Sequence, residues 1–316
     1  MATNHLDNPI FQDADKARAW LEGHLWPDGP VCGYCGTVNN ATPLATRPGY
    51  YQCNEPSCRC QFTVMVGTLF ERSHIPLNKW LMAAFLLCSS KKGISAHQMH
   101  RMIGVSYKST WFMMHRLREA MREGPQAGPL GGKNKTVEAD EAYIGGKEAN
   151  KHRSKRSRDG RGPVGKEAVV SLVERKGRVR STHLPTVNSK NLRPLLYSQI
   201  DRHSYLMTDE SKVYRAIGED FAGHGSVNHS IEEYVRGGFW HTNTVENYFS
   251  ILKRGITGTY HHVSQQHLKR YLAEFDFRYN ERATLDVDDK LRAEKALRGI
   301  VGKRLTYRRT GERAHQ

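Results

Sequence analysis

The sequence lacks any run of about 18 apolar residues, the length that a helix needs to cross a lipid bilayer. Its longest apolar stretch, at residues 80–88, is only as long as a core helix. The first residues also lack the basic segment and the following apolar segment of a secretory signal. We therefore expect a protein that remains in the cytoplasm, where thiols stay reduced.

Acidic side chains are scarce by comparison with basic ones. The 316 residues include 32 Asp and Glu against 48 Lys and Arg, which gives a net charge of +16 and a pI near 9.6. Such an excess favours a polyanionic partner, either nucleic acid or an acidic membrane surface. Because no membrane-spanning run accompanies the charge, nucleic acid is the better candidate.

Cysteine is rare outside one region, because five of the six cysteines lie between residues 32 and 60. In a reducing compartment such a cluster is typical of metal ligation rather than of disulfides. Cys32-Gly-Tyr-Cys35 supplies two ligands, and a closed tetrahedral zinc site, which is structural, needs a second pair. Cys53 with either Cys58 or Cys60 completes the set, and we favour Cys58 as the fourth ligand. A group of unligated buried thiols is the alternative.

Residues 91–121 have the pattern of a helix-turn-helix. A helical segment at 95–103 is followed by a turn at Gly104, and Ser106 can cap a second helix. The early residues of such a second helix face the major groove of DNA. A plain pair of helices without DNA contacts is the alternative. The candidate DNA-binding residues are Tyr107, Lys108, Ser109, Thr110, Arg116 and Arg118.

A Gly- and Pro-rich stretch at 124–135 marks the clearest domain boundary, and beyond it the pattern changes from helices to strands. The expected order there is β-β-β-α-β-α-β-α, which describes an RNase H-like domain. The predicted fold class is α/β, with an RNase H-like catalytic domain preceded by a zinc ribbon and a helix-turn-helix region. The expected segments are a helix and zinc ribbon at 1–66, a helical DNA-binding domain at 67–123, the linker at 124–135, the catalytic domain at 136–285 and a basic tail at 286–316.

Three acids in the catalytic domain suit a metal site. Asp140 lies on the first strand, Asp209 ends a later strand, and Glu246 lies on a helix. Two Mg²⁺ or Mn²⁺ ions for phosphoryl transfer need only a few carboxylate ligands, because such ions keep several waters. Lys253 follows Glu246 by two helical turns and shares its face, where Lys253 and Arg254 can contact phosphate. Each acid by itself is more often a turn, cap or solvated residue.

The acids that flank these positions leave the choice of ligands open. Glu138 and Glu141 flank Asp140, and Glu210 follows Asp209. Strand alternation puts Glu138 and Asp140 on one face and Glu141 on the other. After a Gly-Gly turn, residues 147–165 are strongly basic, which indicates either a solvated loop or a clamp for phosphates.

Motifs along most of the chain occur in a recognisable order. They are Trp26-Pro-Asp-Gly-Pro30 before Cys32-x2-Cys35, Gly67-Thr with Ser73-His-Ile-Pro-Leu77, Glu138-Ala-Asp-Glu-Ala-Tyr-Ile-Gly-Gly-Lys147, Thr208-Asp-Glu210, His241-Thr-Asn-Thr-Val-Glu246, Leu252-Lys-Arg-Gly255, Gly258-Thr-Tyr-His-His-Val263 and Glu274-Phe-Asp-Phe-Arg-Tyr-Asn280. In these motifs the chain resembles bacterial DDE-class insertion-sequence transposases of the ISXO-two-like group, which carry an N-terminal zinc ribbon. The resemblance implies Asp140 and Asp209 as metal ligands, with Glu246 or a neighbouring Asn as the third.

The resemblance also implies an activity and partners. A transposase of this class binds the terminal inverted repeats of its element, cleaves one DNA strand with Mg²⁺, and joins the freed 3′-hydroxyl to target DNA. It works as a dimer or larger assembly on double-stranded DNA in the bacterial nucleoid. A zinc-ribbon DNA-binding regulator without catalysis and a structure-specific nuclease with the same fold are the alternatives.

Overall fold

We describe a computed structural model of the chain, which covers residues 5–124, 126–146, 151–156, 164–227 and 241–306. The chain divides into two compact units. One consists of Met1–Arg122 together with Asp286–Gln316, and the other of Glu123–Leu285. None of the helices described has the length and apolar character of a membrane span.

The first unit begins with helices beside a small sheet. The 3₁₀ turns η1 (His5–Asp7) and η2 (Pro9–Phe11) precede α1 (Ala14–Leu25). Asp13 caps α1, because its Oδ1 accepts hydrogen bonds from the N–H groups of Asp15 and Lys16. The strands of the ribbon pair in antiparallel order β1-β2-β3, with bounds β1 (Ala41–Pro43), β2 (Tyr51–Cys53) and β3 (Gln61–Phe62).

The two-helix arrangement expected at 91–121 is present in the rest of this unit. Gly104 ends the first helix with a φ of 69°, a left-handed value that glycine adopts without strain. Ser106 then caps the second helix by accepting a hydrogen bond from Ser109 N (3.4 Å). The helices here are α2 (Leu77–Ser89), α3 (Ala96–Ile103), α4 (Tyr107–Ala120) and α9 (Asp289–Arg298).

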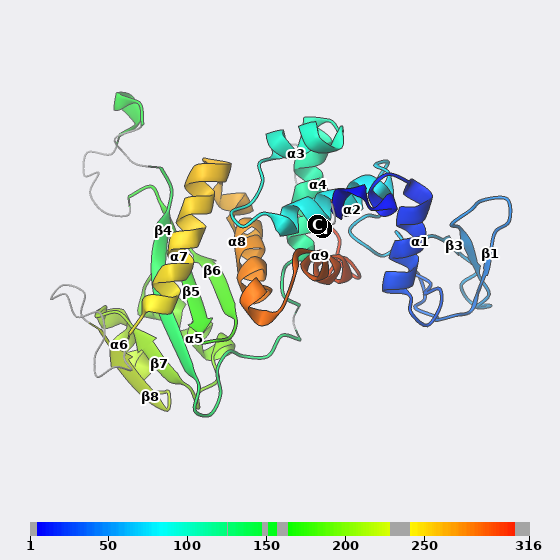
Figure 1. Ribbon diagram of the computed structural model, residues 1–316. Helices are drawn as coiled ribbons and strands as arrows, with labels where there is room; N and C mark the ends of the chain where they lie inside the picture. The colour runs from blue at the N-terminus through cyan, green and yellow to red at the C-terminus, as the bar shows by residue number, and fades with distance from the viewer. Residues whose placement is uncertain (1–4, 125, 147–150, 157–163, 228–240, 307–316) are drawn as a thin grey trace. The chain divides into compact units, whose positions relative to one another are not determined.

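The segment expected as a basic tail is part of this unit, so that expectation needs correction. Helix α9 packs on α2, and Figure 1 shows it beside α2 and α4. Nη1 of Arg292 donates to the carbonyl oxygen of Cys88 at the end of α2 (3.1 Å). The many basic residues of the segment made it look like a solvated tail, but it has an apolar face. The buried residues of that face are Ala293, Ala296, Leu297 and Ile300.

The residues after α9 are bonded to the same unit. Leu69 N donates to Ile300 O (3.0 Å) and Gly302 N donates to Gly67 O (2.9 Å). Lys303 Nζ donates to three carbonyl oxygens at the end of α4, those of Glu119, Ala120 and Arg122, at 3.0, 3.0 and 2.7 Å. The last carbonyls of a helix have no partner within it, and a cation suits the negative end of its dipole. Residues 307–316 of the expected tail lie outside the described part of the chain.

The second unit is built on a five-stranded sheet with the order β6-β5-β4-β7-β8. The central strand β4 pairs antiparallel with β5 and parallel with β7. The outer pairs are β5 with β6, antiparallel, and β7 with β8, parallel. The strand bounds are β4 (Thr136–Ile144), β5 (Glu167–Glu174), β6 (Val179–Leu184), β7 (Tyr205–Thr208) and β8 (Gly223–Ser226).

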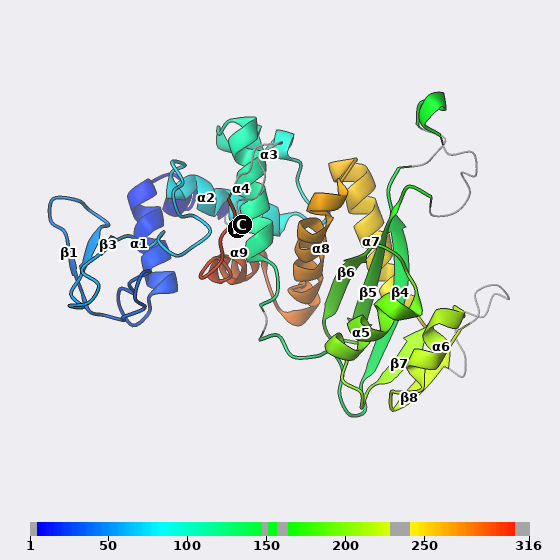
Figure 2. The same cartoon turned by 180° about the vertical axis from the view of Figure 1, so that it is seen from behind.

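Helices cover both faces of this sheet. Figure 1 shows α7 and α8 on one face, and Figure 2, seen from behind, shows α5 and α6 on the other. The predicted order β-β-β-α-β-α-β-α agrees with the described elements. The helix bounds are α5 (Ser189–Gln199), α6 (Lys212–Gly218), α7 (Asn243–Gly255) and α8 (Gln265–Asn280), with short turns η4 (Arg153–Lys155), η6 (Ile256–Tyr260) and η7 (Ala283–Leu285).

Alternation along β4 divides its side chains between two cores. Val137 and Ala139 pack with residues of α5 and α6, whereas Ala142 and Ile144 pack with residues of α7 and α8. Glu138 and Asp140 share the face of Ala142, so both acids lie on the side that α7 covers.

One carboxylate joins α7, α8 and the edge strand β6. Asp276 on α8 accepts hydrogen bonds from Ser181 N (2.8 Å), Ser181 Oγ (2.7 Å) and Tyr248 Oη (2.5 Å). Burial raises the pKa of Asp276 to about 6, although these three donors favour its charged form.

Replacement of Lys303 by Met should lower the free energy of unfolding of the first unit by roughly 1–3 kcal/mol, because three carbonyl oxygens lose a charged donor. Urea unfolding followed by tryptophan fluorescence measures this change, because Trp20, Trp26, Trp80 and Trp111 lie in that unit. Lys290→Met, at an exposed position of α9, is the control and should leave the transition where it is. A loss of the same size in both variants would contradict the prediction.

Asp276 should make the second unit less stable as the pH rises. Its folded pKa of about 6 lies above the ordinary 3.8, so the folded state binds the proton more tightly. The resulting stability is complete below pH 3.8 and is lost as the pH rises through about 6. Relative to Asp276→Asn, the wild type should lose roughly 1–3 kcal/mol between about pH 4 and pH 7. Denaturation followed by circular dichroism tests this, and a pH-independent difference would refute it.

Candidate metal centres and nucleic-acid contacts

Four cysteine sulfurs gather at the ribbon. The Sγ atoms of Cys32, Cys35, Cys53 and Cys58 all lie within 4.8 Å of one another. Cys32 Sγ is 3.8 Å from Cys58 Sγ, and Cys35 Sγ is 3.7 Å from Cys53 Sγ. A tetrahedral zinc ion about 2.3 Å from each sulfur requires sulfur–sulfur separations of about 3.8 Å. The four side chains therefore fit a structural zinc ion as they stand.

The fifth cysteine of the region lies outside this group. Cys60 Sγ donates to the carbonyl oxygen of Cys58 (3.3 Å). The geometry thus favours Cys58 over Cys60 as the fourth ligand, in agreement with the choice made from the sequence.

The thiols of the cluster differ in acidity. Hydrogen bonds with Thr37 lower the pKa of Cys35 to about 6, whereas burial raises the pKa of Cys32 and raises that of Cys53 to about 12. Two of the thiols therefore retain their protons at neutral pH unless a cation stabilises the thiolate. A zinc ion would supply that stabilisation and would link Cys53 at the end of β2, and Cys58 in the turn after it, to the first knuckle.

In the second unit, the register of β4 and β7 relates the first two acids. Glu138 on β4 lies opposite Met207 on β7 in a parallel pair. The pairing ends there, and Asp140 and Asp209 each follow two residues later, Asp209 just beyond the end of β7. Asp209 is held there in part by Ser211, whose N–H donates to its Oδ1 (3.1 Å).

Asp140 lies in the field of three other carboxylates. Burial raises its pKa to about 7, with further contributions from the charges of Glu141, Asp209 and Glu246. The N–H of Glu141 donates to Asp140 Oδ1 (2.7 Å) and opposes the increase. Among the described residues only the cysteines bring three or more candidate ligand atoms within 4.8 Å of one another, so Asp140, Asp209 and Glu246 do not form such a compact group.

Helix α7 presents Glu246 on an exposed face. Thr242 Oγ1 donates to Glu246 Oε1 (3.2 Å) at the start of the helix. Asn243 and Lys253 are exposed on the same side of α7, as the spacing predicted. The opposite side is buried in the core through Val245, Tyr248, Phe249 and Leu252. Arg254 is also exposed, and its Nη2 donates to Ser250 Oγ (2.9 Å).

The acids that flank Asp140 have partners of their own. Glu138 is completely buried and accepts hydrogen bonds from the first turn of α7. Glu141 lies on the other face, where Tyr214 Oη donates to its Oε2 (2.8 Å). Sequence reasoning missed both contacts. The only sign in the sequence that Glu138 is buried was its place between the apolar residues Val137 and Ala139. Nothing in the sequence linked Glu141 to Tyr214, which lies 73 residues later.

The expected DNA-binding residues of α4 divide into two groups. Tyr107, Lys108 and Ser109 are exposed at its start. Thr110 is buried, and its Oγ1 donates to Val105 O (3.2 Å), while only 2% of Arg118 is exposed. Both lie on the helical stripe that faces the core, so their assignment as DNA contacts is corrected.

Arg116 is partly exposed, but its guanidinium also bonds to the protein. Its Nε donates to Leu305 O and its Nη1 to Glu71 O, each at 3.2 Å. It therefore ties the segment after α9 to the loop before α2. Most of the candidate phosphate clamp at 147–165 lies outside the described residues.

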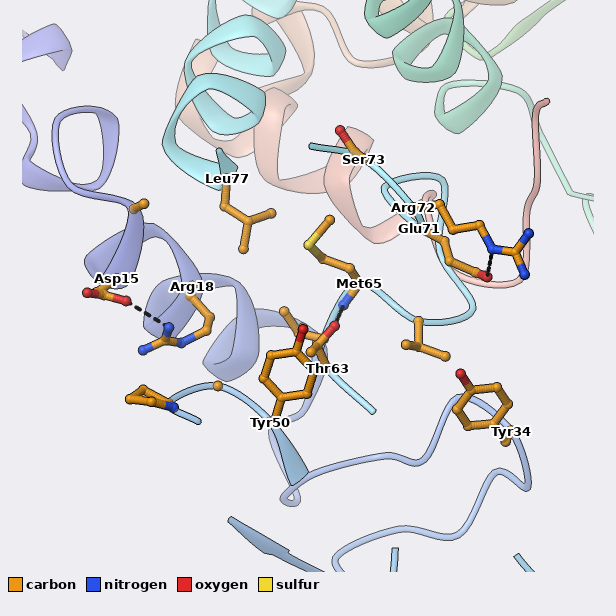
Figure 3. Close-up of a pocket in the computed structure, with 15 residues that line it drawn as sticks. Asp15, Arg18, Tyr34, Tyr50, Thr63, Met65, Glu71, Arg72, Ser73 and Leu77 are labelled. Atoms are coloured by element: carbon orange, nitrogen blue, oxygen red, sulfur yellow. Dashed lines mark hydrogen bonds and ion pairs between the residues drawn. The ribbon is translucent and has the colours of Figure 1, made fainter. Parts of the chain in front are cut away.

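A cavity of about 470 Å³ opens in the first unit between α1, the ribbon and the loop at 63–73. Figure 3 shows two arginines at its wall, each beside an acid. Arg18 Nη1 is 2.7 Å from Asp15 Oδ1, and Arg72 Nε is 3.7 Å from Glu71 Oε1. Because these charges are compensated, the cavity is a poor site for an anion.

Comparison with known proteins places these features in a class. Residues 129–280 match the family described as "ISXO2-like transposase domain", and residues 12–61 match the family described as "Transposase zinc-ribbon domain". The first range contains Asp140, Asp209 and Glu246, and the second contains the four clustered cysteines. Residues 129–280 are thus similar to ISXO2-like transposase domains, and residues 12–61 to transposase zinc ribbons.

A relative extends the similarity over most of the chain. It is an "Uncharacterized protein in transposable element ISH50" from Halobacterium salinarum, 29% identical over 283 residues. The alignment covers 85% of this chain and 91% of the relative. The resemblance drawn from the sequence motifs is confirmed.

The purified protein should contain about one zinc ion per chain, bound by four thiolates. Cys58→Ser should lose this zinc, because three thiolates bind it far more weakly than four, and the ribbon should unfold with it. Cys60→Ser is the matched control and should retain the metal. Elemental analysis after dialysis against a chelator measures both, and zinc retained by Cys58→Ser but lost by Cys60→Ser would reverse the assignment.

Proposed function

We propose that this protein is a DDE transposase that binds the terminal inverted repeats of its insertion sequence and catalyses metal-dependent strand cleavage and strand transfer. The observation that carries the proposal is the position of Asp140 and Asp209, each two residues beyond the last paired positions of β4 and β7, with the charge of Asp209 contributing to the raised pKa of Asp140. Glu246 on α7 adds to the same field, because its charge raises the pKa of Asp140.

The strand order β6-β5-β4-β7-β8, with three antiparallel strands followed by two parallel ones, supports an RNase H-like catalytic domain. In this proposal Asp140, Asp209 and Glu246 hold two Mg²⁺ or Mn²⁺ ions. When bound, such ions activate the attacking oxygen and stabilise the leaving oxygen of the phosphodiester. The raised pKa of Asp140 supports the fit, since a carboxylate surrounded by like charges is stabilised by a cation.

The protein residues have distinct parts in this reaction. Asp140 lies on β4 and Asp209 directly follows the neighbouring strand β7, while Thr242 orients Glu246 through its hydroxyl. Lys253 lies two turns beyond Glu246 on the same exposed face, where it can bind a phosphate of the DNA strand being cut. Arg254 is a second cation of this helix end. No covalent intermediate between protein and DNA is required.

Recognition of DNA ends belongs to the first unit in this proposal. The ribbon and the pair α3–α4 form a DNA-binding region of helix-turn-helix type, with Tyr107, Lys108 and Ser109 exposed at the start of α4. The net charge of +16 supports binding to the phosphate backbone. The partners are double-stranded transposon ends and target DNA, bound by a homodimer or larger assembly in the nucleoid of the cytoplasm.

Asp140→Asn should abolish strand joining with Mg²⁺ while binding of end DNA is retained. Loss of metal ions that contribute several kcal/mol to the transition state corresponds to at least about a hundredfold in rate. Asp209→Asn and Glu246→Gln should behave alike. Asp220→Asn, an exposed acid that accepts a hydrogen bond from Tyr197, is the control and should keep wild-type activity. The assay uses labelled DNA ends from the element.

The same assay separates the alternatives. A DNA-binding regulator without catalysis predicts that wild type and Asp140→Asn are equally inactive. A structure-specific nuclease predicts cleavage of branched DNA irrespective of the end sequence. Dependence on both the end sequence and Asp140 supports the transposase alone.

A further inference from the structure

Glu138 is a carboxylate in the middle of the protein. None of its surface is exposed, and its neighbours along β4 are the buried residues Val137 and Ala139. A buried charge of this kind is costly unless it is paired and hydrogen-bonded. It is two residues before Asp140 on the same face of the strand, the face that α7 covers in Figure 1.

The partners of Glu138 come from the first turn of α7. Its Oε2 accepts hydrogen bonds from Thr244 N (2.8 Å) and Val245 N (3.0 Å), and its Oε1 accepts one from Thr244 Oγ1 (2.8 Å). The first N–H groups of a helix have no acceptor within it. A negative charge there also suits the positive end of the helix dipole. Glu138 therefore caps α7 from a strand more than 100 residues earlier.

The residue at the cap position of α7 does not perform this task. Thr242 makes no capping hydrogen bond with its side chain, and its hydroxyl donates to Glu246 instead. Glu138 thus accepts the hydrogen bonds of the first N–H groups of α7, and the hydroxyl of Thr242 remains available to donate to Glu246 one turn later.

Arg175 completes the arrangement from the turn between β5 and β6. Its Nε donates to Glu138 Oε1 (2.7 Å), and its Nη2 donates to the carbonyl oxygen of His241 (2.9 Å), the second residue before α7. Its own N–H donates to Thr136 O at the start of β4 (3.0 Å). A planar guanidinium can make these divergent bonds, which an ammonium cannot reproduce.

We propose that Glu138 and Arg175 are positioning residues that set α7 on β4, and thereby set the separation of Glu246 from Asp140. The inference rests on the proposed function, in which these two acids hold metal ions. Glu138 fixes the first turn of α7, and Glu246 follows the capped residue Val245 directly. Asp140 follows Glu138 by two residues on a strand that is paired on both edges. The hydrogen bonds between Glu138 and the first turn of α7 therefore link the strand that carries Asp140 to the helix that carries Glu246.

Binding of Mn²⁺ to the full-length protein, measured by electron paramagnetic resonance without DNA, tests this proposal. Glu138→Gln keeps the shape of the side chain but removes its charge. Its amide N–H₂ group then faces groups that are themselves donors, in Arg175 or at the start of α7. It should raise the Kd for Mn²⁺ at the Asp140 site by about tenfold or more, as loss of outer-shell support does at other metal sites. Strand cleavage should then need correspondingly more Mn²⁺, while the KM for end DNA stays at the wild-type value.

Arg175→Lys is the milder second variant, which decides the question if Glu138→Gln does not fold. It should weaken Mn²⁺ binding in the same direction. Glu174→Gln is the matched control, since Glu174 is a buried acid of the same sheet that accepts hydrogen bonds from Gly131 N and Lys135 Nζ, away from α7. It should lower the Tm without changing the Kd for Mn²⁺.

The outcomes separate this proposal from the function on which it rests. Folded Glu138→Gln or Arg175→Lys protein with wild-type Mn²⁺ affinity overturns the positioning role while the transposase proposal stands. A weakening equal in Glu174→Gln also overturns it, because general loss of stability then explains the effect. If wild type and Asp140→Asn bind Mn²⁺ equally, the proposed metal site itself is refuted.

Discussion

Pairing of β4 on both edges is the constraint on which the second unit depends. With β5 on one side and β7 on the other, its side chains have only two directions available. Val137 and Ala139 enter one core and Ala142 enters the other, so that a single strand holds both layers of helices to the sheet. The same alternation sends Glu138 and Asp140 toward α7, where one is buried and the other remains partly exposed.

The two candidate metal centres differ in geometry and in the ionisation of their ligands. At the ribbon the sulfur–sulfur separations of 3.8 and 3.7 Å already fit a tetrahedral ion, so binding requires loss of protons rather than movement. The three acids do not form a group as compact as the cysteines, and burial together with the neighbouring negative charges raises the pKa of Asp140. The first centre suits a structural role, because four thiolates fill the coordination of a zinc ion.

Some residues predicted from sequence patterns were confirmed by the structure, and others were not. The cysteine spacing was sufficient to favour Cys58, because knuckle ligands are local in sequence. In α4 the spacing identified the helix but not its orientation, and Thr110 and Arg118 turned out to lie on its buried side. The basic composition of 286–316 likewise gave no sign of α9. The apolar face of α9 packs on α2, which lies about 200 residues earlier in the chain.

The sequence by itself determined Cys32, Cys35 and Cys53 as ribbon ligands, with a preference for Cys58, and the order of strands and helices, because these depend on local spacing or periodicity. The candidates Asp140, Asp209 and Glu246 came from the resemblance of the motifs to a known family. Only the tertiary structure decided that Asp209 acts on Asp140, that Glu138 caps α7 with help from Arg175, and that the C-terminal segment completes the first unit. These are contacts between residues far apart along the chain, formed by strand register and by the need to satisfy a buried charge, and no local pattern encodes them.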